Sequence, residues 1–308
     1  MIFLFDSSIQ TDDKKSIAIL ADCLRKICHD GHQVENNKTW RDFCEKDVLK
    51  TDFLGQIYID EIHLNREMLN ATSDDKRFYQ RIKVGVGEGM CDVNQLHTLL
   101  FQASEVALEN ETYDGCAIRK WVEYYVDEPI FEDVNKKVYK AISDLRLKFH
   151  HAGGGDGSIR VLLQNLEPQF GAISNLKLLT VFDSDKNSKD ETGSKNASLK
   201  TFLDENGYKY HCLVKREMEN YFPLSLFQAC GLIKKNKPVP TYTDESWDYV
   251  KIPKEKYLDY DKPNMRDLAA NATKEHIKQR IAHQEKFPST KGNVDEIQHV
   301  ILLFAKFV

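Results

Sequence analysis

Two aspartates that follow an apolar run are the residues best suited to chemistry in this chain. Residues 178–185 read LLTVFDSD, so Asp183 and Asp185 stand two positions apart at the end of a predicted strand. Side chains two positions apart on a strand lie on one face, so both carboxylates are expected to point the same way, toward solvent. Carboxylate oxygens suit Mg²⁺, and such sites usually serve phosphate chemistry. An acidic loop after a core strand is the alternative explanation.

A glutamate and a glycine-rich turn extend this pattern. Residues 106–108 form a predicted short strand that runs directly into Glu109. The turn HAGGGDG at residues 151–157 includes Gly154 and Gly155, where glycine lets the backbone pass close to a neighbouring group. That group is a neighbouring strand, the carboxylate site or a bound phosphate.

The segment LVKREMENYFP at residues 213–223 adds a third acidic position, Glu219, which also suits a helix cap or a pair with Arg216. Lys215 and Arg216 precede it. Two adjacent cations are suited to binding a substrate phosphate, and equally to a structural ion pair.

Strands alternate with helices along much of the chain, which predicts an α/β fold with a mostly parallel sheet flanked by helices. Strands are expected at residues 2–5, 56–62, 106–108, 176–182 and 209–214. Helices are expected at residues 15–28, 40–49, 94–105, 114–125, 158–166, 199–206, 264–285 and 294–307. In such sheets the reactive site lies beyond the carboxyl ends of the strands, where the acidic residues fall.

Changes in composition divide the chain into three parts. Residues 1–98 form an α/β module suited to recognition, dimerisation or partner binding. Residues 99–232 hold the acidic positions, and residues 233–308 form a basic, loop-rich stretch with closing helices. In the first part, Asp6 and Asp60 follow apolar strands and could form a second acidic centre, while the GxGxG at residues 85–89 is interpreted as a tight turn or linker.

The bulk composition limits the classes of function. The 308 residues carry a net charge of −5, so nucleic acid would be bound through local basic patches rather than overall charge. Seven scattered cysteines indicate reduced thiols in a cytoplasmic protein. Cys23, Cys28 and His32 could be a partial metal set, but two cysteines near one helix explain them more simply. We expect no signal peptide and no membrane-spanning run.

Together these motifs resemble the Toprim domain. The glutamate after VAL, the glycine turn, the DxD of VFDSD and the ending REMENY resemble most closely the overcoming-lysogenization-defect (OLD) nucleases and related antiphage effectors. The resemblance covers about residues 103–225. It implies a Toprim-like sheet, with an N-terminal α/β module and a C-terminal helical extension in this chain.

The resemblance also implies roles for particular residues. Glu109, Asp183, Asp185 and Glu219 would bind one or two Mg²⁺ or Mn²⁺ ions and act in catalysis. The family usually has glycine after its glutamate and an acidic residue four positions on, whereas this chain has Asn110 and places Asp114 five positions on. Glu111 therefore competes with Glu109 for the glutamate role. The family's late lysine would be Lys262 or Lys274.

The function implied is a Mg²⁺- or Mn²⁺-dependent endonuclease that hydrolyses phosphodiester bonds of DNA or RNA, including tRNA. No GxxxxGK[ST] motif occurs in the chain, so an ATPase would be a separate partner that gates an antiphage effector. A homo-oligomer is also compatible with the family. The alternative is a Toprim module that binds or regulates without cleaving, which the acidic charge and the altered glutamate motif favour.

Overall fold

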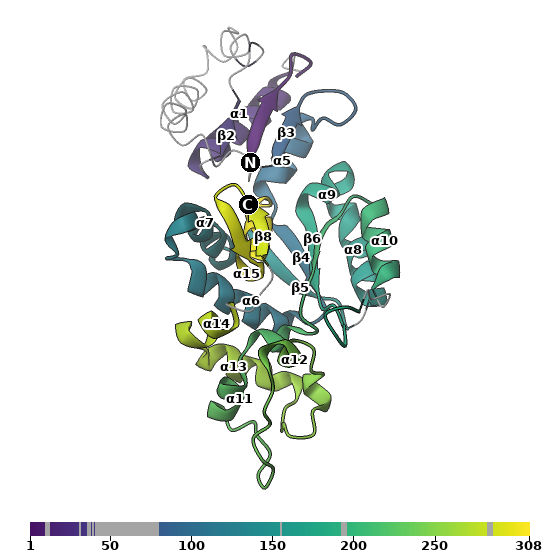
Figure 1. The fold of residues 1–308 in the computed structure, drawn as a ribbon. Helices are drawn as coiled ribbons and strands as arrows, with labels where there is room; N and C mark the ends of the chain where they lie inside the picture. The colour runs from purple at the N-terminus through teal and green to yellow at the C-terminus, as the bar shows by residue number, and fades with distance from the viewer. Residues whose placement is uncertain are drawn as a thin grey trace.

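The computed structural model describes residues 1–9, 13–30, 32–35, 38, 40, 80–154, 156–191, 196–281 and 286–308 (Figure 1). Several expectations lie outside these residues: most of the helix at 40–49, the strand at 56–62, Asp60 and Gly155. The described residues contain an N-terminal sheet, a central sheet and a C-terminal set of short helices.

A four-stranded parallel sheet forms the centre of the molecule, in the order β5-β4-β6-β7. The strands are β4 (Ser104–Leu108), β5 (Leu147–His151), β6 (Leu178–Phe182) and β7 (Lys209–Cys212). Every residue of β4 and β6 is buried, because helices cover both faces of these two inner strands. The predicted α/β class, with a parallel sheet flanked by helices, is confirmed.

Alternate residues of β4 serve two different cores. Val106 and Leu108 belong to one hydrophobic cluster, whereas Ala107 between them belongs to the other. The first face is covered by α6 (Glu111–Tyr125), α7 (Glu132–Ser143) and α15 (Glu296–Ala305). The second is covered by α8 (Asp156–Phe170), α9 (Ser174–Lys177) and α10 (Ala197–Glu205) (Figure 1).

The N-terminal unit is a smaller parallel sheet in the order β2-β1-β3. Its elements are β1 (Ile2–Phe5), β2 (Gln33–Val34), β3 (Arg81–Val84), α1 (Lys14–His29) and α5 (Val93–Phe101). Its buried residues Phe3 and Leu24 share a cluster with Ala107 and Ile159 of the central unit. The two units are therefore joined by a continuous core.

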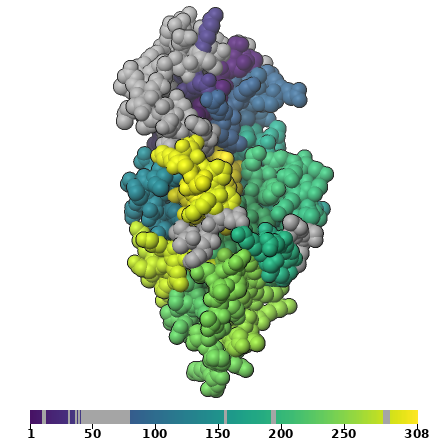
Figure 2. Space-filling model, viewed as in Figure 1, coloured from purple at the N-terminus to yellow at the C-terminus, as the bar shows by residue number. Residues whose placement is uncertain are grey.

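The C-terminal part begins at η4 (Met218–Tyr221) and ends at α15. Between them lie α11 (Leu224–Ala229), α12 (Asp244–Asp248), η5 (Ile252–Lys254), η6 (Lys262–Asn264), α13 (Met265–Asn271), α14 (Lys274–Ile281), β8 (Lys286–Ser289) and β9 (Gly292–Asp295). Residues 286–308, yellow in Figure 2, lie in the middle of the face shown, between the N-terminal unit and the green residues. α15 packs against α6 and α7, so this helix belongs to the central core.

Several predicted boundaries are wrong. The helix expected at 264–285 is two short helices, because Ala272 adopts extended backbone after α13. The helix expected at 94–105 ends at Phe101, since residues from Ser104 onward join the central sheet. Strand β5 and helix α7 were not predicted. Both lie in residues 126–152, although Val134, Val138 and Ala141 of α7 recur at helical spacing.

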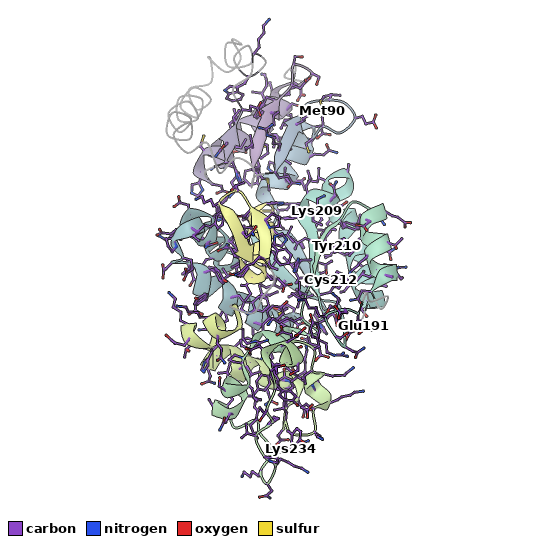
Figure 3. All side chains as sticks on the ribbon, in the orientation of Figure 1. Met90, Glu191, Lys209, Tyr210, Cys212 and Lys234 are labelled. Carbon is purple, nitrogen blue, oxygen red and sulfur yellow. The ribbon has the colours of Figure 1, made fainter. Side chains whose placement is uncertain are left out.

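The turn after β3 requires a glycine at position 85. A Cβ there would lie 2.7 Å from the Ser8 hydroxyl oxygen, 2.9 Å from the Asp6 Cβ and 3.0 Å from the sulfur of Met90, which Figure 3 labels. The GxGxG motif therefore forms a tight turn between β3 and α5, as predicted.

We predict opposite effects for two Gly→Ala substitutions. Gly85→Ala should lower the free energy of unfolding by roughly 1–3 kcal/mol, because the new methyl group would clash with Ser8 and Asp6 in the turn after β1. Gly157→Ala should raise it by up to about 1 kcal/mol, since this helical position has nothing within 4 Å of a Cβ. Urea denaturation of both variants checks the pair; equal effects would contradict the close approach at residue 85.

Candidate functional site

The carboxyl ends of the two inner strands bring two acidic residues together. Glu109 follows β4 directly, and Asp183 follows β6 directly. β4 and β6 are hydrogen-bonded neighbours, with Leu108 opposite Val181. The two acidic side chains therefore start from adjacent positions at one edge of the sheet, as the sequence predicted.

Asp114 joins them through the start of α6. Asn110 caps this helix, and its side-chain oxygen accepts from the Tyr113 backbone N–H at 3.3 Å. Asp114 is buried and its Oδ2 accepts from the Asn110 backbone N–H at 3.0 Å. Asparagine at the position where the resembled family has glycine thus acts as the N-cap, and the acidic residue one turn later points back to it.

Glu111 is turned away from this group. Its carboxylate pairs with Arg119 at 3.1 Å on the partly exposed side of α6. Of the two glutamates that compete for one role, the structure brings Glu109 to the other acidic residues, since Glu109 raises the pKa of Asp183.

The η4 turn supplies the fourth carboxylate. Glu219 is fully buried, and the Tyr260 hydroxyl donates to its Oε1 at 2.9 Å. The Met218 backbone N–H, one residue earlier, donates to Asp183 Oδ1 at 3.0 Å. Asn220 anchors the turn by donating to two backbone carbonyls at 2.6 and 3.0 Å. The ENY sequence therefore holds Glu219 beside Asp183.

A lysine lies between these acidic residues. Lys262 Nζ is 3.2 Å from Asp114 Oδ1 and 3.0 Å from Glu219 Oε1. Helix α13 packs along α6, and Lys262 lies in η6 immediately before α13, so this contact follows from the helix pair. Of the two lysines considered from the sequence, the structure thus brings Lys262 to the acidic residues. Lys274 lies in α14 instead, with its ammonium 5.5 Å from the Tyr124 ring centroid.

Burial and mutual repulsion control the charge of this group. Burial raises the pKa of Asp183 well above its ordinary value; Glu109, Asp114 and Glu219 add to the rise, while Lys262 opposes it. Burial likewise raises the pKa of Asp114. Burial lowers the pKa of Lys262, but Glu219, Asp114 and Asp183 outweigh burial and raise it well above its ordinary value. The ammonium is thus held in its charged form.

We call Glu109, Asp114, Asp183 and Glu219 the carboxylate cluster. Its oxygens are the donors that Mg²⁺ and Mn²⁺ prefer, and Lys262 pairs with two of the four carboxylates. The buried Oε2 of Glu219 accepts no hydrogen bond. The donor chemistry and the excess negative charge therefore fit a divalent cation. However, among the residues that the structure describes, no three or more histidine, cysteine, aspartate or glutamate side chains converge closely enough to hold a metal ion.

Asp185 lies apart from the carboxylate cluster. Strand β6 ends at Phe182, and Asp185 adopts left-handed backbone with φ of 57°, so strand alternation does not extend to it. Its side chain is 42% exposed and lies 3.9 Å from Arg216. The expectation that both aspartates point together toward solvent is wrong, because Asp183 is buried and Asp185 belongs to the following loop.

Lys215 and Arg216 are buried in structural contacts. Lys215 Nζ lies 2.5 Å from Asp248 Oδ1, and Arg280 pairs with the same carboxylate. Arg216 donates to the Lys186 carbonyl at 2.8 Å and to Asn187 Oδ1 at 2.6 Å. The sequence left two roles open for these cations, binding of a substrate phosphate and a structural ion pair. Their contacts match the structural ion pair.

The glycine turn and the N-terminal candidates stand outside the cluster. Gly154 is exposed with φ of 86°, at the carboxyl end of β5 beside β4. Cys23, Cys28 and His32 are buried in the N-terminal unit, where the cysteines form no disulfide. Asp6 accepts from the Ser8 backbone N–H at 2.9 Å and caps the turn after β1.

Tyr260 is the site residue that the sequence analysis missed. It comes from a loop 41 residues beyond Glu219. Burial and the neighbouring Glu219 raise the pKa of its hydroxyl, which keeps the hydroxyl a hydrogen-bond donor. The only signal in the sequence was its place two residues before Lys262, in the run DYDK.

We predict that Lys262→Met destabilises the protein in EDTA. Without the ammonium, Asp114 and Glu219 stay buried with no cation between them, so the free energy of unfolding should fall by roughly 3 kcal/mol. Saturating Mn²⁺ should restore much of it. Lys254→Met, which changes an exposed lysine of the same region, is the control. Thermal unfolding with and without Mn²⁺ checks this, and a loss that Mn²⁺ leaves unchanged would count against the cation site.

We predict that Asp183→Asn stabilises the protein in EDTA. Burial holds the folded-state pKa of Asp183 above its unfolded value, so ionising it costs stability as the pH rises through the folded-state pKa. The amide removes that cost and keeps an oxygen for the Met218 N–H. The variant should be more stable than wild type by roughly 1–3 kcal/mol near neutral pH, and less so toward about pH 4. Denaturation across this pH range measures the difference; a constant difference would contradict the raised pKa.

Comparisons with known proteins do not assign this chain to a family. No protein-family model matches the sequence, and no curated protein or solved structure is significantly similar to it. Among the described helices, none is both long and apolar enough to cross a membrane. Any function must therefore be argued from the carboxylate cluster itself.

Proposed function

We propose that this chain is a Mg²⁺- or Mn²⁺-dependent nuclease that hydrolyses phosphodiester bonds of DNA or RNA. The observation that supports this most strongly is the carboxylate cluster: Glu109 and Asp183 follow adjacent parallel strands, and Asp114 and Glu219, which pair with Lys262, raise the pKa of Asp183 together with Glu109. A buried excess of negative charge stabilises the fold poorly by itself, and it attracts a divalent cation.

The contacts suggest a separate role for each residue of the site. Glu109, Asp183 and Glu219 would bind the cation, which when bound activates water and stabilises developing charge on phosphate oxygens. The Met218 N–H holds one oxygen of Asp183, and the Tyr260 hydroxyl holds one oxygen of Glu219, so both carboxylates are oriented. Lys262 would leave its two carboxylates and pair with a substrate phosphate.

Lysines of the C-terminal part support a nucleic-acid substrate. Exposed lysines gather in the C-terminal part, at positions 235, 237, 251, 254 and 256. Lys234, labelled at the lower tip in Figure 3, is half-buried beside this set and donates to the Lys256 carbonyl at 3.2 Å. Local basic patches can bind a phosphate backbone although the net charge is negative. Both DNA and RNA, including tRNA, remain candidate substrates.

The biological setting is proposed from the resemblance to OLD-type Toprim proteins. It would be a cytoplasmic antiphage effector, with activity gated by a separate ATPase and with a homo-oligomer as a compatible state. Cytoplasmic thiols are supported by the described cysteines, none of which forms a disulfide.

A second candidate function is a Toprim-like module that binds or regulates without cleaving. Two observations favour it: Lys262 pairs with two of the carboxylates, and the described residues contain no group of three or more side chains placed to hold a metal ion. In that case Lys262 would be a permanent partner of the carboxylates and would not exchange with a divalent cation.

We predict metal-dependent cleavage that requires the cluster. Supercoiled plasmid and total tRNA should be incubated side by side with Mn²⁺ or with EDTA. Glu219→Gln and Asp183→Asn should lower the cleavage rate roughly a hundredfold or more. Glu111→Gln, which alters a glutamate beside the site but outside the cluster, should cleave like wild type.

The outcomes separate the two candidates. Cleavage with Mn²⁺ that both cluster variants lose supports the nuclease and identifies its substrate class. Mn²⁺ binding by calorimetry without cleavage of either nucleic acid supports the non-cleaving module or an effector that its partner ATPase must first activate. Cleavage that survives in Glu219→Gln and Asp183→Asn would contradict the site.

A further inference from the structure

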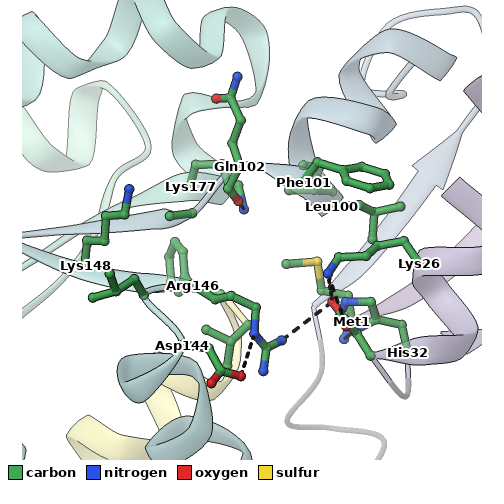
Figure 4. Close-up of a pocket in the computed structure, with 16 residues that line it drawn as sticks. Met1, Lys26, His32, Leu100, Phe101, Gln102, Asp144, Arg146, Lys148 and Lys177 are labelled. Carbon is green, nitrogen blue, oxygen red and sulfur yellow. Dashed lines mark hydrogen bonds and ion pairs between the residues drawn. The ribbon is translucent and has the colours of Figure 1, made fainter. Parts of the chain in front are cut away.

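A cationic cavity lies at the opposite edge of the central sheet from the carboxylate cluster. It has a volume of about 240 Å³ and lies between the N-terminal unit and the amino ends of β4, β5 and β6 (Figure 4). Lys177 immediately precedes β6, Arg146 immediately precedes β5, and Lys148 lies within β5. A five-residue strand separates the two edges by roughly 15 Å, so this cavity is distinct from the cluster.

Basic side chains outnumber acidic ones in the cavity. Lys26, Arg146, Lys148 and Lys177 line it, against Asp30 and Asp144. Asp30 is shared, since it lies 3.0 Å from Lys26 and 3.6 Å from Arg146. Asp144 lies 3.9 Å from Arg146. Both aspartates are therefore engaged, and the side chains that line the cavity are four basic ones against these two acidic ones.

Lys177 carries a buried ammonium group, and burying that charge costs free energy of folding. Only 3% of it is exposed, and its ammonium donates to the Gln102 carbonyl at 2.6 Å and to Ser104 Oγ at 3.3 Å, both uncharged. Burial lowers the pKa of Lys177 to about 7, with Glu105 opposing and Arg146 adding to the effect. A bound anion would stabilise the charged ammonium that burial disfavours.

An exposed leucine with unusual backbone stands beside these cations. Leu145 lines the cavity, is 64% exposed and has φ of 56°. It occupies the left-handed position after α7, with Arg146 N–H bonded to the Ala141 carbonyl at 2.8 Å, where glycine is the usual residue. Phe101, which is 39% exposed, also lines the cavity. A left-handed leucine is strained, which points to a role other than folding.

We propose that this cavity binds the phosphate group of a small phosphate ester, whose organic part lies against Leu145 and Phe101. Arg146, Lys148 and Lys177 contact the phosphate, as guanidinium and ammonium groups do in charge-assisted hydrogen bonds. Because the cavity is lined by both units, the ligand also joins the N-terminal unit to the central sheet.

Calorimetry on the full chain in EDTA tests this site without metal at the carboxylate cluster. The probes are AMP, as a phosphate ester with a flat organic part, and inorganic phosphate. AMP should bind to wild type with a Kd below about 1 mM and more tightly than inorganic phosphate. Arg146→Gln and Lys148→Glu should each weaken AMP binding by at least about tenfold, which is 1.4 kcal/mol.

Two further variants separate binding from folding. Lys209→Glu makes the same charge change as Lys148→Glu on an exposed lysine of the same sheet edge, outside the cavity (Figure 3), and should bind AMP like wild type. Leu145→Gly removes a strained side chain, so its melting temperature should match or exceed wild type, while the preference for AMP over phosphate is lost.

Three results would overturn the proposal. They are no AMP binding by wild type at about 1 mM, equal binding of AMP and inorganic phosphate, or AMP binding that Arg146→Gln and Lys148→Glu leave unchanged. None of these results depends on nuclease activity.

Discussion

The ion pairs of Lys262 with Asp114 and Glu219 are the interaction on which the described site depends. Four carboxylates meet where two inner strands, a helix start and the η4 turn converge. Repulsion among them would open this region if no cation were present. Lys262 supplies that cation from the C-terminal part of the chain, so the site is complete only when α13 packs against α6.

Several anchors surround this charge group and keep it rigid. Asn110 caps α6, and its backbone N–H donates to the Asp114 carboxylate. Asn220 fixes η4, because its side-chain amide donates to two backbone carbonyls. Behind η4, Tyr221 donates to the buried Glu296 of α15, which also accepts from the Val214 N–H at 2.7 Å. The last helix of the chain therefore supports the turn that carries Glu219, which explains its place in the central core.

The sequence predicted the parts of the structure that depend on local patterns. Apolar runs identified β1 and β6, and the residues after β4 and β6 were correctly placed at one sheet edge. Local patterns could not show that Asp185 leaves the strand direction, because that depends on a left-handed turn and on Arg216. They also could not choose between Lys262 and Lys274 or find Tyr260, since those contacts join segments about 40 residues apart.

The proposed function requires the carboxylate cluster to exchange its lysine for a divalent cation. A crystal structure of the wild-type protein with Mn²⁺, with anomalous scattering measured at the manganese edge, tests this most directly. We expect a manganese peak among Glu109, Asp183 and Glu219, with the Lys262 ammonium displaced from Glu219. A structure with Lys262 still paired to both carboxylates, and no manganese at the cluster, would contradict it.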